Sequence, residues 1–95
     1  MIVGICKLTL YLHGCRSLKE KRQVLRRIKD RTANNFCINV SEVGSGDMWQ
    51  RAELGFAAVG NDRRVIEGLI QKIINFIDGE HIAEILDEHK EIINA

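Results

Sequence analysis

Seven aliphatic side chains recur every three or four residues near the middle of the chain, and this pattern constrains the fold more than any other. They are Val65, Ile66, Leu69, Ile70, Ile73, Ile74 and Ile77. The spacing predicts a helix with a broad apolar face, which begins after Asp62 as N-cap and stops at Gly79. Such a face must be buried, so the chain needs another layer of structure to cover it.

Three alternating segments can supply that layer, because period-two alternation of apolar residues predicts strands with one apolar face. The segment 2–12 places on one face Ile2, Cys6, Leu8, Leu10 and Leu12. The segment 36–43 does so with Phe36, Ile38 and Val40, and the segment 49–60 with Ala52, Leu54, Phe56 and Ala58. The glycines of "GSGD" between the last two segments predict a tight connection, so we expect those two strands to pair as an antiparallel hairpin.

A second helix is expected between the first two strands. Ser17 and Glu20 have the spacing of a capping box, in which a hydroxyl and a carboxylate satisfy free backbone N–H groups at the start of a helix. A narrow apolar stripe follows at Leu18, Val24, Leu25 and Ile28, and "ANN" ends the helix near residue 34.

The tail is ambiguous by pattern. Its apolar residues and His89 fit helical spacing better than alternation, so pattern alone predicts a third helix over 82–93. A strand there would instead complete the order β-α-β-β-α-β, the ferredoxin-like split motif, with one antiparallel sheet and two helices on one of its faces. In either case, 95 residues make a single α+β domain, residues 1–95.

Three separated motifs resemble one known family. "SLKEKR" after the first strand, then "NVSEVG", then "WQRAELGFAAV" are similar to the YlxP-like family, a domain-of-unknown-function family numbered 503. The resemblance implies a ferredoxin-like fold, a final strand in place of the third helix, and a bacterial-type cytosolic protein. It also implies a gene that often lies beside genes for translation initiation and ribosome maturation. The resemblance implies no catalytic residues for this chain.

The strongest functional signal is the charge of the first helix. Residues 15–31 hold eight cations against two acids, although the net charge of the chain is only +1. This excess suggests a surface for phosphate groups, and we predict contact with RNA or a ribosome-associated partner. The alternative is a solvated helix face. The predicted contact residues are Arg16, Lys19, Lys21, Arg22, Arg26, Arg27, Lys29 and Arg31.

A second candidate surface is the open face of the sheet. Apolar side chains on that face would form a patch typical of a protein interface, and no RNP-like aromatic run marks it as an RNA platform. We therefore expect a homodimer. The predicted interface residues are Val3, Ile5, Tyr11, Trp49, Ala57 and Val59. For the lone Trp49, packing at the hairpin end is favoured over an interface role, with Asp47 and Gln50 fixing the turn.

The remaining polar residues predict little chemistry. Three unevenly spaced cysteines suggest free thiols and a cytoplasmic location, with Cys6 inward, Cys37 outward, and Cys15 beside a helix start that favours its thiolate. His13 and the cysteines do not have metal-site spacing, so we predict no metal and no other cofactor. We also expect no membrane segment, because the apolar runs are short, and no signal peptide.

Three functional hypotheses follow. The first is a non-enzymatic binding module whose basic helix contacts RNA or a translation-associated partner. The second is a dimeric protein-interaction adaptor without nucleic-acid binding. The third is a small acylphosphatase-like hydrolase that would hold an anion in the loop around Gly14 and Arg16, although the rest of that signature is absent. An enzyme is the less favoured outcome, and no small-molecule substrate is evident.

Overall fold

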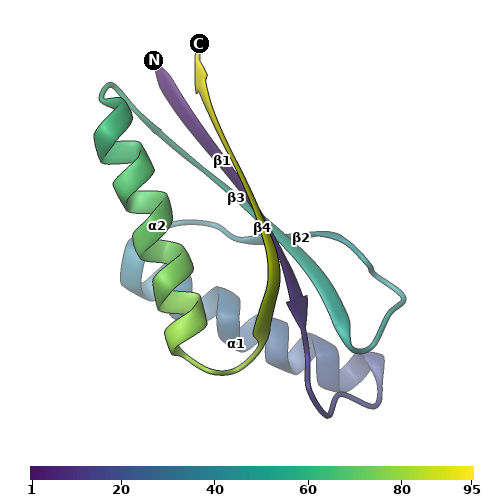
Figure 1. The fold of residues 1–95 in the computed structure, drawn as a ribbon. Coiled ribbons are helices and arrows are strands. Elements are labelled where there is room, and N and C mark those ends of the chain that lie inside the picture. Colours follow the sequence, from purple (N-terminus) through teal and green to yellow (C-terminus); the bar gives the residue numbers. More distant parts are fainter.

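The fold is one antiparallel sheet with two helices on one of its faces (Figure 1). The computed structural model describes residues 1–95, and the strand order is β2-β3-β1-β4. Neither helix is long and apolar enough to cross a membrane. The elements are β1 (Ile2–Tyr11), α1 (Leu18–Phe36), β2 (Ser41–Gly44), β3 (Arg51–Gly60), α2 (Arg63–Gly79) and β4 (Glu84–Asn94). This is the predicted ferredoxin-like α+β sandwich.

The core lies between the sheet and the helices. The predicted inward residues of β1 and β3 are buried, except for Ile2, which is half-buried. Helix α2 covers β1 closely at Gly4, where an added Cβ would lie 2.4 Å from Cδ1 of Ile70. Asp62 caps α2 as predicted, since its carboxylate accepts the backbone N–H groups of Arg64 and Val65. Val65 does not belong to the buried stripe, because its side chain is 63% exposed.

Helix α1 runs two residues further than predicted, so the strand predicted over 36–43 is much shorter. The ring of Phe36 packs edge-to-face on Phe76 with centroids 5.4 Å apart, which holds the last turn against α2. Cys37 then ends the helix in a left-handed conformation, with φ of 53°. The strand begins only at Ser41, although Val40 is still buried.

The tail forms β4, so the helix predicted by its pattern is wrong and the strand implied by the family resemblance is confirmed. Along β1, Leu10 pairs with Ile85 but Thr9 pairs with Asp87, so Leu86 is an extra residue in a β-bulge. The bulge shifts the alternation by one position. Ile85 and Ile92, seven residues apart, therefore face the helix side together, and this spacing imitates a helix.

Candidate nucleic-acid interface

The start of α1 is built by reciprocal capping. The Ser17 hydroxyl accepts the backbone N–H of Glu20 at 3.1 Å, as predicted. The Glu20 carboxylate accepts the backbone N–H of Arg16 at 2.6 Å, one residue before the expected partner. A carboxylate therefore already binds at the helix start where the hydrolase hypothesis would place a phosphate, and an anion in this loop would have to displace it.

Lys21 is not part of the surface, so its predicted contact with nucleic acid is wrong. Its side chain is 2% exposed, because position 21 lies on the same helix face as the buried Leu25 and Ile28. The ammonium donates to the carbonyl oxygens of Ser45 and Met48 at 2.6 and 2.7 Å. It also lies 3.1 Å from the Glu42 carboxylate on β2. Lys21 thus ties the β2–β3 loop to α1.

Four other cations of α1 form a continuous line, which we call the cation stripe: Lys19, Arg22, Arg26 and Lys29. Their spacing of three, four and three residues places them on one helix face over about 15 Å. Three are exposed and Lys29 is half-buried. None has an ion pair within the chain. Of the other predicted contacts, Arg16 and Arg27 are exposed outside the stripe, and Arg31 pairs with Glu80 at 2.7 Å.

A groove runs beside the stripe, between α1 and β2. Its volume is about 330 Å³, and three members of the stripe line it together with Leu25, Asp30 and Glu42. The acidic excess of the chain lies elsewhere: β4, at the opposite edge of the sheet from β2, holds four acids and one lysine. Helix α1 thus carries an excess of cations and β4 an excess of acids.

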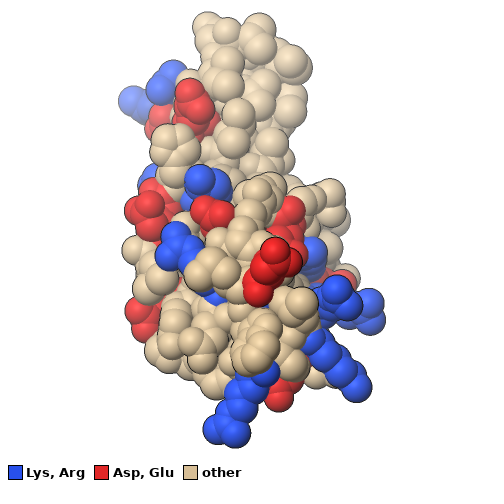
Figure 2. Space-filling model, turned by 90° about the vertical axis from the view of Figure 1, so that its right-hand side faces the viewer, with Lys and Arg blue, Asp and Glu red and all other residues tan.

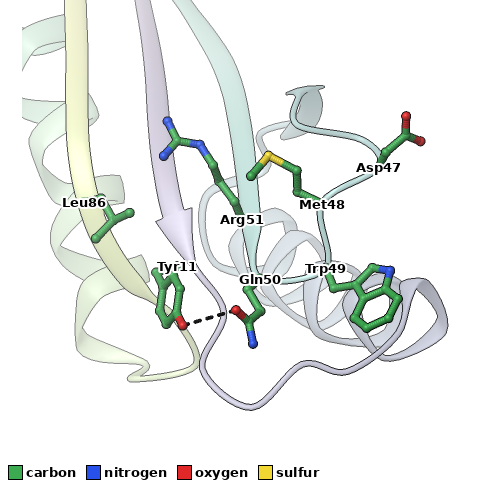
Figure 3. A pocket seen from close by; sticks show the side chains of 7 residues that line it. All are labelled: Tyr11, Asp47, Met48, Trp49, Gln50, Arg51 and Leu86. Carbon is green, nitrogen blue, oxygen red and sulfur yellow. Dashed lines mark hydrogen bonds between the residues drawn. The ribbon is translucent and has the colours of Figure 1, made fainter.

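The loop before β3 carries a second cluster. Trp49 is 51% exposed, so the prediction that it packs structurally is wrong. Asp47 makes no hydrogen bond, and Gln50 accepts one from the Tyr11 hydroxyl at 3.3 Å, so Lys21 rather than the flanking residues fixes the loop. An open pocket of about 520 Å³ lies here, lined by Tyr11, Asp47, Met48, Trp49, Gln50, Arg51 and Leu86 (Figure 3).

The predicted interface residues divide into two groups. Val3 pairs with Val59 and Ile5 with Ala57 near the end of the sheet where both termini lie (Figure 1). Tyr11 lies eight residues further along β1, about 27 Å away, on the side of Trp49. The prediction of one continuous apolar patch on the open face of the sheet is therefore wrong. The end near the termini remains an apolar group, which Ile93 of β4 joins by pairing with Val3.

The three thiols are free, with Cys6 and Cys15 buried and Cys37 exposed. Burial raises the pKa of the Cys15 thiol, and the nearby Glu20 carboxylate adds to the effect, so the predicted thiolate is not favoured. Burial likewise raises the pKa of Cys6 from 9.0 to about 11. His13 bonds the Glu84 carboxylate at 2.9 Å, and no three metal-ligating side chains converge anywhere.

The geometry defines a ferredoxin-like domain with a basic first helix and an open sheet face. A family model described as "Protein of unknown function (DUF503)" matches residues 3–90, so the chain belongs to that family. It is 40% identical over 77 residues to the uncharacterized protein YlxP of Bacillus subtilis (strain 168), which covers 81% of this chain and 84% of the relative. A solved structure titled "protein YJCS" has the same fold, with a TM-score of 0.54 at 12% identity over 97% of this chain and 99% of that one.

Proposed function

We propose that this protein is a non-enzymatic RNA-binding module whose cation stripe on α1 contacts backbone phosphates. One observation carries the proposal: four cations, three of them exposed, lie in a line on one face of α1 and form no ion pair within the chain. Exposed cations at regular spacing suit a polyanion with regularly spaced phosphates, and their binding releases counterions. A ribosome-associated RNA would be a partner of this class.

The test compares two triple charge reversals of equal size. Arg22→Glu, Arg26→Glu and Lys29→Glu reverse the stripe. Arg63→Glu, Arg64→Glu and Lys72→Glu reverse three exposed cations of α2 and change the net charge equally. The assay measures fluorescence anisotropy of a labelled RNA hairpin at low salt. We expect the stripe variant to lose about tenfold or more in affinity, and the α2 variant to lose much less.

Equal losses in the two variants would mean that only net charge matters, and would contradict a site on α1. Affinity unchanged in the stripe variant would remove the proposal. Circular dichroism of each variant checks that the fold is intact.

Pairing with a second copy is a further candidate role, favoured by the apolar group near the termini. Figure 2 shows uncharged side chains at the top of this face, with charged side chains of both signs at its upper left. The group spans three strands and comprises Val3, Ile5, Ala57, Val59 and Ile93. Its neighbours along the open face are Lys7 and Glu91, so a two-fold arrangement could set Glu91 of one copy against Lys7 of the other.

Light scattering tests this pairing. Val3→Asp with Ile5→Asp should convert a dimer to monomers, whereas Val65→Asp on the exposed side of α2 should leave the mass unchanged. A monomeric wild-type protein, or a double variant that stays dimeric, would contradict a dimer through this face.

A further inference from the structure

The groove between α1 and β2 is lined by acids as well as by cations. Arg22, Arg26 and Lys29 suit phosphate groups, whereas the carboxylates of Asp30 and Glu42 in the same lining repel them. A groove for phosphates alone would bind more tightly without these two acids. A ligand that fits this groove must therefore satisfy both kinds of side chain.

Neither carboxylate is fully occupied by a cation of its own chain. Asp30 is exposed and forms no ion pair, although Arg26 lies four residues before it on the same helix. The side chain of Glu42 is 33% exposed, and the Lys21 ammonium lies 3.1 Å from its Oε2. A carboxylate has two oxygens, each with more than one lone pair, so Glu42 still has room to accept another hydrogen bond.

The chemistry of a carboxylate limits what it can contact on a nucleic acid. An ionised carboxylate only accepts hydrogen bonds, so it needs a donor on the ligand. The sugar–phosphate backbone of DNA has no donor, and that of RNA has one, the 2′-hydroxyl. This hydroxyl is attached next to the carbon that carries the 3′-phosphate. A strand whose phosphates lie on the cations of the groove therefore brings its hydroxyls close to the acids.

We propose that the groove recognises the ribose of RNA, with Arg22, Arg26 and Lys29 binding phosphates while Asp30 and Glu42 accept hydrogen bonds from 2′-hydroxyl groups. The inference rests on the proposed function and narrows the partner from any polynucleotide to RNA. Both acids repel the phosphates of RNA and DNA alike, but only RNA offsets the repulsion with hydrogen bonds. The contact involves the backbone alone, so it is independent of base sequence.

The experiment compares one labelled RNA hairpin with a copy in which fluorine replaces every 2′-hydroxyl. The copy keeps the base sequence, the phosphates and the sugar pucker typical of RNA, but its sugars cannot donate a hydrogen bond. Affinities are measured by fluorescence anisotropy at low salt. We expect the wild type to bind the RNA about fivefold or more tightly than the fluorinated copy, because hydrogen bonds to charged groups are among the stronger ones.

Asp30→Ala separates recognition from simple repulsion. Removal of an acid beside the cations strengthens the binding of both hairpins, so the informative quantity is the ratio of the two affinities. We expect Asp30→Ala to lower this ratio by about half or more, and Glu42→Ala to lower it as well. Asp78→Ala is the matched control, because it removes an exposed acid of α2 that does not line the groove. It should leave the ratio unchanged.

The outcomes separate the two proposals. If the wild type binds both hairpins equally and reversal of the stripe abolishes both, the stripe stands and ribose recognition is wrong. If neither Asp30→Ala nor Glu42→Ala changes the ratio, or Asp78→Ala changes it as much, the two acids do not read the ribose and the inference is wrong. If neither hairpin binds at low salt, the proposed function fails and the inference falls with it.

Discussion

A single buried lysine organises the candidate site. Lys21 has lost nearly all contact with water, but its ammonium keeps three partners: two loop carbonyl oxygens and the Glu42 carboxylate. A buried cation is tolerated only when its donors are used in this way. The same contacts hold the backbone of Ser45 and Met48 in the loop before Trp49, so the lysine acts by positioning this loop and not by its charge toward a ligand.

Replacing Lys21 with methionine tests this role. Methionine keeps most of the packing but removes the donors, so the carbonyls of Ser45 and Met48 lose their partner. We expect the free energy of unfolding in urea to fall by about 2–3 kcal/mol. The same change at the exposed Lys19 should alter it by less than about 0.5 kcal/mol. A loss at position 21 no larger than that at position 19 would contradict the role of Lys21 as an anchor.

The thiol of Cys6 links stability to pH. Its pKa is raised from 9.0 to about 11 in the folded protein, so the folded state holds this proton more tightly than the unfolded state. The contribution is complete below pH 9 and is lost as pH rises toward 11. At pH 10 the free energy of unfolding should be about 1 kcal/mol lower than at pH 8 from this group. Urea titrations in reductant measure it, and Cys6→Ala should lack this part of the decline. An identical decline in both proteins would mean that other groups cause it.

Among the elements, β4 is the one whose hydrophobic pattern predicted the wrong type of secondary structure, because it contains a β-bulge. Regular alternation would put Ile85 and Ile92 on opposite faces, because seven is an odd number. The bulge at Leu86 brings them to the same face, where Ile92 packs over Gly4 beneath α2. Nothing in the tail marks the bulge, since Leu86 is neither glycine nor a turn residue.

The register of β4 can be tested at two adjacent isoleucines. Ile92 faces the helix layer, whereas Ile93 lies opposite Val3 on the open face. We expect Ile92→Asp to lower the free energy of unfolding by about 2 kcal/mol, because a carboxylate would replace a partly buried side chain that packs against the core. Ile93→Asp should cost less than about 1 kcal/mol. Chemical denaturation followed by circular dichroism measures both, and a larger cost at position 93 would show that the register is reversed.

Elements whose local signals agreed were predictable. Helix α2 has a stripe, a cap and a terminal glycine that all point to the same bounds, and β3 alternates without interruption. The segment 36–40 was not predictable in this way. Its alternation is real, but Phe36 packs edge-to-face on Phe76 at the end of α1 and does not join a strand. The contact between Phe36 and Phe76 therefore determines where α1 ends.

At the scale of the whole molecule, α1 and β4 carry opposite excesses of charge. The basic helix α1 reaches β2 through Lys21 and Glu42, while the acidic β4 lies at the other edge. The sequence predicted the excess of cations on α1. It did not predict which of these cations are exposed and free of ion pairs, and so able to contact a ligand. Burial removed Lys21 and the Glu80 carboxylate paired with Arg31, so six of the eight predicted cations have no ion pair, and four of these six lie in a line. Position 21 shares its face with Leu25 and Ile28, and that spacing was the signal that could have revealed its burial.

The number of available cations sets a measurable salt dependence. If the four members of the stripe each neutralise one phosphate, the logarithm of the binding constant should fall with the logarithm of salt concentration with a slope of about −3. Arg22→Ala with Arg26→Ala removes two contacts, so the slope should become shallower by about 1.5. Arg63→Ala with Arg64→Ala on α2 should leave it unchanged. Anisotropy titrations of one RNA hairpin from low to physiological salt give these slopes. A wild-type slope near zero, or the same change in both double variants, would show that RNA does not bind along the stripe.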